Sequence, residues 1–198
     1  MSEYQVNQGR RRLLTATTAV VGAAGAGLAA IPFIQSWQPS AKARVVGGPV
    51  EFNIAPLEPG QLLRGSWRGQ TVGILRRDDT MLQNLEQVED RLADPESLVD
   101  QQPTYAQNQA RALNPEYLVL IMICTHLGCI PELVPEVGPQ PFDEDWLGGF
   151  YCPCHKSKFD LAGRVYKGVP APTNLQVPPY RYIDDRTIEV GADPEQLS

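Results

Sequence analysis

The stretch "CPCHKSKFD", residues 152–160, places two cysteines and one histidine within four residues of one another. An earlier stretch, "ICTHLGCI", residues 123–130, holds two further cysteines and one further histidine. The chain of 198 residues has four cysteines and two histidines, and all six lie in these two stretches. Such a concentration of Cys and His in two short segments indicates a metal site, a disulfide or both.

The spacing of the six side chains leaves several kinds of site open. Four of them can bind a metal while two form a disulfide, or all six can be ligands. A structural zinc site needs four ligands, and the two remaining cysteines would form a disulfide, which persists in exported proteins. However, only one residue separates Cys124 from His126, which is shorter than the usual spacing of two to four in a zinc knuckle.

Two other chemistries compete with zinc. A catalytic cysteine is a weak alternative, because a nucleophile needs one Cys beside a base rather than two loops of the same composition. An iron–sulfur cluster with mixed ligation needs two Cys on one iron and two His on the other. The sequence favours this last interpretation, with the zinc module plus a disulfide kept as an alternative.

The N-terminal region is predicted to be a membrane anchor. Residues 13–37, "LLTATTAVVGAAGAGLAAIPFIQSW", contain no charged side chain, and a helix of this length reaches across the roughly 30 Å core of a bilayer. Three arginines, residues 10–12, directly precede it, which predicts a cytoplasmic N-terminus. The stretch "RRRLL" also resembles a twin-arginine export signal. A cleaved signal peptide is the alternative, with "AKA" at residues 41–43 as the cleavage site, but the apolar run exceeds the usual 7–15 residues.

The rest of the chain predicts short strands and turns. The whole chain has 17 Gly and 18 Pro, many of which fall between short apolar runs. Its net charge of −6 argues against a nucleic-acid partner. Residues 116–123 and the stretch "GGFYC" predict buried strands that each lead into one Cys/His loop. Further elements are expected in segments that share apolar patterning: strands at 50–54, 61–67 and 71–76, a helix at 80–92 capped by Asp79, a surface loop at 96–114, and strands in "GRVYKG", "LQVPPYRYID" and "TIEVG".

The two loops carry a resemblance to a known family. "CTHLGC" and "CPCHKS" are similar to the two cluster-binding boxes of Rieske proteins. With the arginine-led anchor, the small-residue linker and the later "GVPAPTNLQVPPY", the chain resembles the iron–sulfur subunits of bacterial respiratory cytochrome bc complexes, the ubiquinol–cytochrome c reductases. The Rieske domains of ring-hydroxylating oxygenases are similar but lack the second pair of cysteines.

This resemblance implies a mainly β fold. A single N-terminal transmembrane helix would be followed by a small antiparallel all-β Rieske domain with a cluster-binding subdomain. The expected segments are a cytoplasmic twin-arginine N-terminus at 1–12, an anchor at 13–37, a hinge linker at 38–48, and a periplasmic domain at 49–198 with the cluster-binding subdomain at about 122–173.

The resemblance also implies the role of each site residue. One [2Fe–2S] cluster would be held by the two Cys and two His ligands Cys124, His126, Cys152 and His155. The disulfide would join Cys129 and Cys154. Residues around the cluster would be the shielding Leu127, the hydrogen-bond donor Ser157, the ring at Phe159, and the proline loop with Gly168, Pro170 and Pro172. Two positions depart from the common pattern: Lys156 stands where many members have Gly, and Phe159 where many have Tyr.

The function implied is electron transfer from quinol to a c-type cytochrome, with the exposed ligand His126 or His155 also taking a proton. Expected partners are the cytochrome b and c-type cytochrome subunits, within a dimeric complex in the bacterial inner membrane. The chain would act as a subunit of the reductase rather than as an enzyme alone. The alternative is the small Rieske subunit of another exported oxidoreductase, such as arsenite oxidase.

Overall fold

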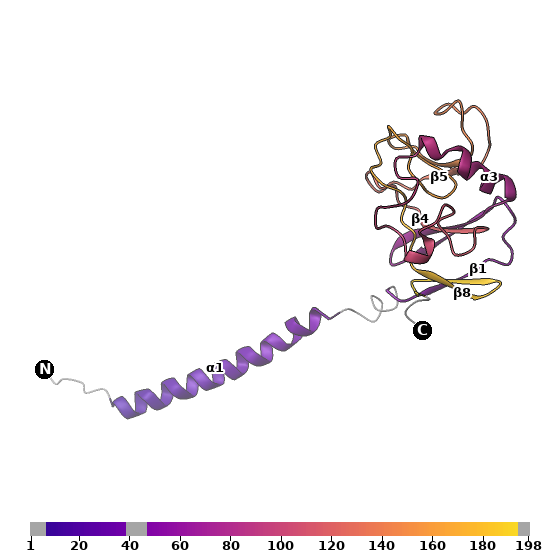
Figure 1. Cartoon of the computed structure of the whole chain (residues 1–198). Coiled ribbons are helices and arrows are strands. Elements are labelled where there is room, and N and C mark those ends of the chain that lie inside the picture. Colours follow the sequence, from indigo (N-terminus) through magenta and orange to yellow (C-terminus); the bar gives the residue numbers. More distant parts are fainter. Residues whose placement is uncertain (1–6, 39–46, 194–198) are drawn as a thin grey trace. The chain divides into compact units, whose positions relative to one another are not determined.

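A computed structural model describes residues 7–38 and 47–193 (Figure 1). Residues 1–45 and 46–198 form separate units. The elements in chain order are α1 (Gln8–Ser36), β1 (Val50–Asn53), β2 (Leu62–Trp67), β3 (Gln70–Arg76), α3 (Asp79–Gln87), η1 (Glu89–Arg91), η2 (Thr104–Ala106), β4 (Tyr117–Ile121), β5 (Glu132–Val134), β6 (Gly149–Cys152), β7 (Ser157–Phe159), β8 (Tyr180–Asp184) and β9 (Thr187–Val190).

Helix α1 contains residues 13–36 of the predicted anchor at 13–37, and Trp37 is its C-terminal cap. It begins five residues before the apolar run, because the side chain of Asn7 caps it by accepting from the backbone N–H of Gly9 and Arg10 at 3.1 and 3.2 Å. Its 29 residues rise about 43 Å, and by length and composition it can cross a membrane. The expected cleavage site at 41–43 and most of the hinge linker at 38–48 lie outside the described residues.

The domain is built from three antiparallel sheets of three strands each, which confirms the predicted all-β class. Their strand orders are β1-β9-β8, β2-β3-β4 and β5-β6-β7. The sheet that contains β1 and β8 lies at one end of the domain, and β5 lies towards the other (Figure 1). Arg68 and Gly69 both have positive φ and link β2 to β3 as a two-residue hairpin.

Strands β4 and β6 confirm the prediction that buried strands lead into the two Cys/His loops. Four consecutive residues of β4, Leu118 to Ile121, are almost fully buried. The continuous apolar run follows from this burial, since neither face of the strand meets water. The segment 116–123 is shortened at both ends to Tyr117–Ile121, and β6 ends at Cys152 itself.

Several predicted elements differ from those observed. The helix cap is Asp78 rather than Asp79, because the Asp78 carboxylate accepts from the N–H of Met81 at 2.8 Å. Helix α3 ends at Gln87, and a 3-10 turn replaces the rest of the expected helix. The stretch "GRVYKG" makes only isolated bridges. In "LQVPPYRYID" the strand begins at Tyr180, because two prolines before it have no N–H to donate.

Three buried arginines fix the turn that follows β7. Arg164 donates to the buried Asp160 carboxylate at 2.7 Å, while Arg77 and Arg111 donate to the carbonyls of residues 161 and 162 at 3.0 and 3.1 Å. Burial lowers the pKa of Arg77 and Arg111 to about 10, so both stay protonated at neutral pH. Arg111 lies in the segment expected to be a surface loop, so that part of the prediction is wrong.

Candidate metal centre

The two Cys/His loops have the same local backbone geometry. In the first, the N–H of Gly128 donates to the carbonyl of Cys124 at 2.9 Å. In the second, the N–H of Lys156 donates to the carbonyl of Cys152, also at 2.9 Å. Each loop therefore closes four residues after its first cysteine, and both closing residues have positive φ.

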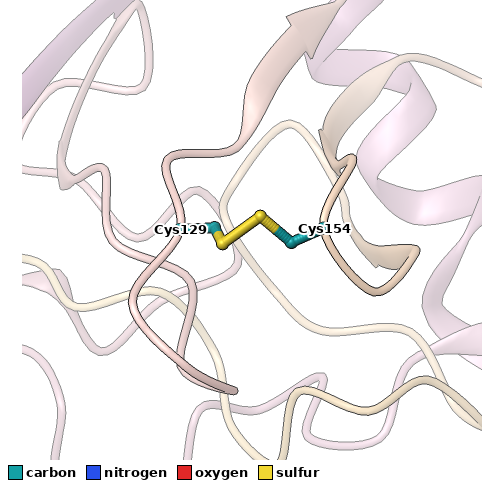
Figure 2. Close-up of a disulfide and its surroundings, with 2 residues drawn as sticks. All are labelled: Cys129 and Cys154. Atoms are coloured by element: carbon teal, nitrogen blue, oxygen red, sulfur yellow. A yellow bond between two sulfur atoms is a disulfide. The ribbon is translucent and has the colours of Figure 1, made fainter.

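A disulfide joins the two loops, as predicted (Figure 2). It links Cys129 and Cys154 with a Cα–Cα distance of 6.6 Å. The sulfur of Cys152 lies within 4.8 Å of both disulfide sulfurs. Because disulfide sulfurs are no longer thiols, this grouping is not a three-cysteine metal site. The free thiols left are Cys124 and Cys152.

These two thiols lie buried beside each other, with exposed fractions of 3% for Cys124 and 1% for Cys152. Burial raises the pKa of Cys152, and a hydrogen bond with Cys124 acts in the same direction. The backbone N–H groups of Cys154 and His155 hydrogen-bond to the Cys152 sulfur and lower this pKa. Such N–H donors also stabilise a thiolate bound to a metal ion.

The rings of His126 and His155 contact each other edge to face. The ring centroids of His126 and His155 are 4.6 Å apart, with an angle of 89° between the planes. Nδ1 of His126 is buried and has no hydrogen-bond partner within residues 7–38 and 47–193. A buried ring nitrogen without a partner is costly, and coordination to a metal would satisfy it. Two thiols and two imidazoles in adjoining loops thus fit a mixed-ligand iron–sulfur cluster.

The proline loop, residues 168–172, and Thr173, which directly follows it, are tied to both Cys/His loops. The hydroxyl of Thr125 donates to the carbonyl of Thr173 at 2.7 Å. The N–H of Ala171 donates to the hydroxyl oxygen of Ser157 at 3.0 Å. Together with the disulfide, these bonds join all three loops pairwise. No sequence pattern predicted the role of Thr125, whose only signal is its place between two predicted ligands.

The remaining predicted site residues fall into two groups. Ser157 and Phe159 are fully buried and lie on the same face of β7, where Ser157 pairs with Cys152 of β6. Leu127 is 70% exposed beside His126, and Gly168, Pro170 and Pro172 are exposed in the proline loop. The structure therefore gathers all of these residues in or beside the three loops, while their roles toward a cluster stay predictions.

Comparisons with known proteins agree with this donor set. Residues 57–180 match the family described as "Rieske [2Fe-2S] domain". The chain is therefore a Rieske protein, whose cofactor is a [2Fe–2S] cluster. Residues 1–40 match the family described as "Ubiquitinol-cytochrome C reductase Fe-S subunit TAT signal", which agrees with the predicted twin-arginine signal and a single-pass membrane anchor.

Relatives that align with nearly the whole chain identify its family more closely. The ubiquinol-cytochrome c reductase iron-sulfur subunit of Allochromatium vinosum is 55% identical over 193 residues, which cover 98% of this chain and 93% of the relative. That of Blastochloris viridis is 43% identical, covering 92% and 93%. Among solved structures, "Hyperthermophilic respiratory Complex III" aligns at 22% identity over 88% of this chain and 98% of that chain, with a TM-score of 0.49. By its sequence relatives, this chain belongs to the family of ubiquinol–cytochrome c reductase iron–sulfur subunits.

Proposed function

We propose that this chain is the membrane-anchored electron-transfer subunit of a quinol–cytochrome c oxidoreductase. The observation that carries the proposal is the pair of disulfide-linked loops with two free thiols and two imidazoles. Similarity over nearly the full chain, anchor included, supports this function over that of the small subunit of another exported oxidoreductase, such as arsenite oxidase.

The four ligands divide the donor atoms between two irons. Cys124 and Cys152 would hold one iron through sulfur, and His126 and His155 would hold the other through ring nitrogen. When bound, the cluster supplies one-electron chemistry at potentials that span about −150 to +300 mV in Rieske centres. Because the unpartnered Nδ1 of His126 is the buried ring atom, we assign it to iron, which leaves Nε2 of that ring to hold a proton.

The exposed histidine is the better proton acceptor from quinol. His155 is exposed, whereas His126 is half-buried. A quinol releases both electrons and protons, so a ligand imidazole at the surface can accept a proton at its free nitrogen as the electron leaves the quinol. Either ring can do so chemically, and exposure favours His155.

Neighbouring residues have supporting roles in this proposal. The hydroxyl of Ser157 accepts from the N–H of Ala171, and its own hydrogen is left to donate to a sulfur of the cluster. Leu127 shields the iron held by histidine from water. Residues 168–172 cover the cluster from the other side, held in place by the bonds of Thr125 and Ser157.

The arrangement in the membrane follows from the N-terminal charges. The three arginines at 10–12 stay in the cytoplasm and residues 49–198 lie in the periplasm of a bacterium, with α1 spanning the inner membrane. The partners are cytochrome b and a c-type cytochrome within a dimeric complex. The segment 38–48 acts as a hinge that lets the domain move between the quinol site and the acceptor haem, and 122–173 is the cluster-binding subdomain.

Purification from membranes tests this function. We expect the chain to co-purify with b- and c-type haems and to give a Rieske signal in low-temperature EPR after reduction. Added quinol should reduce the cluster and then the c-type haem. A chain that carries the EPR signal but purifies without these haems supports the alternative oxidoreductase. A purified chain with zinc and no iron contradicts both.

A further inference from the structure

The part of the domain that carries the Cys/His loops differs in charge from the rest of it. We define the tip as residues 123–130, 152–157 and 167–173, which the disulfide and two hydrogen bonds join. The tip contains two lysines and no Asp or Glu. Over residues 47–198 as a whole, 22 Asp and Glu stand against 12 Lys and Arg. An acidic domain therefore presents a basic tip.

Lys156 differs from the neighbouring lysines in having no partner among the described residues. Lys167 donates to the carbonyl of Asp90 at 2.9 Å, and Lys158 donates to the Asp143 carboxylate at 2.7 Å. The ammonium of Lys156 makes no hydrogen bond or ion pair with any residue that the structure describes. It is exposed and directly follows the predicted ligand His155.

Lys156 also lines a cavity with rigid apolar walls. The cavity, of about 570 Å³, is lined by Pro141, Phe142, Tyr151 and Lys156. The rings of Phe142 and Tyr151 stack with centroids 3.9 Å apart and planes 9° apart. Phe142 also contacts the buried Trp146 edge to face, with ring centroids 5.1 Å apart, and this contact restrains the Phe142 ring. A free cation at the rim of such a cavity suits a carboxylate carried on a short apolar stem.

The backbone of Lys156 has an unusual conformation. Its φ of 63° lies in the left-handed region, where a side chain is unfavourable and glycine is not. Gly128 fills the equivalent place in the first loop. A lysine in this conformation is strained, and such strain makes the residue a candidate for a functional role.

We propose that Lys156 and the cavity beside it form a docking site for an Asp or Glu side chain on the c-type cytochrome partner. This rests on the proposed function, which supplies the partner. The domain meets the c-type cytochrome in water. There, attraction between opposite charges guides their approach over about 8 Å, the screening length at physiological salt. Quinol dissolves in the bilayer, so its site on cytochrome b is expected at the membrane, where a carboxylate that faces Lys156 would lose hydration at a cost. The partner surface therefore combines an apolar patch, facing Leu127 and Ile130, with a carboxylate facing Lys156.

Zero-length cross-linking in the purified complex tests the pairing directly. A water-soluble carbodiimide activates a carboxylate, the Lys156 amine attacks it, and an amide forms as a urea leaves. We expect mass spectrometry to find Lys156 joined to an Asp or Glu of the c-type cytochrome. Lys156→Arg keeps the charge but cannot form this amide, so the cross-link should disappear. A cross-link to cytochrome b instead, or none at Lys156, would overturn the proposal.

Rate measurements then separate charge from structure. In the complex carrying Lys156→Gln, reduction of the c-type haem should be about 3–10-fold slower at low salt and less salt-dependent than in the wild type, while Lys156→Arg should match the wild type. Arg186→Gln, the same charge change at the exposed β8–β9 turn, is the matched control and should have little effect. An unchanged salt dependence in Lys156→Gln overturns the docking site.

The two proposals fail in different ways. EPR spectrum and midpoint potential, recorded for each variant, show whether the cluster itself has changed. If wild-type membranes lack quinol–cytochrome c activity or the chain lacks haem partners, the proposed function fails. If that activity is present and Lys156→Gln behaves as the wild type, only the docking site is wrong.

Discussion

Gly128 and Lys156 hold the same position in the two Cys/His loops. The N–H of each donates to the carbonyl of the cysteine four residues earlier, at 2.9 Å in both cases, and their φ angles are 84° and 63°. For a residue with a Cβ, this left-handed conformation costs roughly 1–2 kcal/mol. Glycine adopts it freely but loses more chain entropy on folding, roughly 0.5–1 kcal/mol. The two loops therefore bear different amounts of backbone strain.

We predict opposite effects of two substitutions at these positions. Lys156→Gly should stabilise the loop by about 0.5–1 kcal/mol, and Gly128→Ala should destabilise its loop by about 1 kcal/mol. The measurement is the temperature at which the intact, detergent-solubilised chain loses its cluster absorbance. A lower temperature for Lys156→Gly than for the wild type would show that its side chain stabilises the second loop more than its backbone strains it.

The parts of the site that sequence could predict are local. Both loops, their leading strands and the Cys129–Cys154 disulfide follow from two short motifs and the family resemblance, and the structure agrees. The bond from Thr125 to Thr173 spans 48 residues, and no local pattern reports such a pairing. The resemblance also flagged the departure at Lys156, while its left-handed φ required coordinates.

The buried arginines show the same limit more strongly. Arg77, Arg111 and Arg164 come from distant segments and meet at one turn. Arginine is usually exposed, so composition placed Arg111 in a surface loop. Its burial depends on carbonyl acceptors from residues 162 and 163, which only the folded chain brings within reach. The predicted capping residue of α3 was wrong for a simpler reason: Asp78 and Asp79 are neighbours with equal capping ability.

The ligand assignment predicts which substitutions remove the cluster. His126→Ala or His155→Ala should abolish it, since an open iron position in a loop near water is labile. Cys129→Ser should keep all four ligands but make the loops less stable, because the disulfide that joins them is lost. Iron and acid-labile sulfide are measured in each purified variant. An intact cluster in His155→Ala would rule out that residue as a ligand.

We expect the free energy of unfolding of the domain to depend on the ionisation of Asp143 at acid pH. Its carboxylate is 5% exposed and accepts from Arg91 at 2.6 Å and Lys158 at 2.7 Å. Burial alone would raise the pKa of Asp143, but the hydrogen bonds from Arg91 and Lys158 outweigh it and lower the pKa below its usual value. A depressed pKa means that the stabilisation is full above about pH 4, the unfolded value, and is lost as the pH falls through the folded value.

Asp143→Asn should therefore destabilise the domain by about 1–3 kcal/mol at pH 7, and its stability should fall less steeply than that of the wild type below about pH 4. Denaturant unfolding at several pH values measures both effects. Glu144→Gln, one residue along and exposed, is the matched control and should behave as the wild type. Parallel pH profiles for Asp143→Asn and the wild type would show that this carboxylate does not carry the acid dependence.

Hydroxyl groups near the cluster affect its redox potential. A hydroxyl that donates to a sulfur of the cluster withdraws negative charge and stabilises the reduced state, so the midpoint potential rises. Ser157 can supply one such bond, because its oxygen already accepts from Ala171 and its hydrogen is free to donate. Ser157→Ala should therefore lower the midpoint. Phe159, buried on the same face of β7, cannot supply a second bond.

Phe159→Tyr should raise the midpoint by about 30–60 mV, if a new hydrogen bond contributes about 1 kcal/mol to a one-electron couple. A redox titration followed by EPR gives the value in the whole chain. Phe159→Leu is the control: it changes the packing without adding a donor, so a shift of the same size there would assign the effect to packing. If Phe159→Tyr leaves the midpoint unchanged or lowers it while the EPR line shape stays that of the wild type, the ring at 159 does not face a cluster sulfur. Ser157 would then be the sole hydroxyl donor from β7.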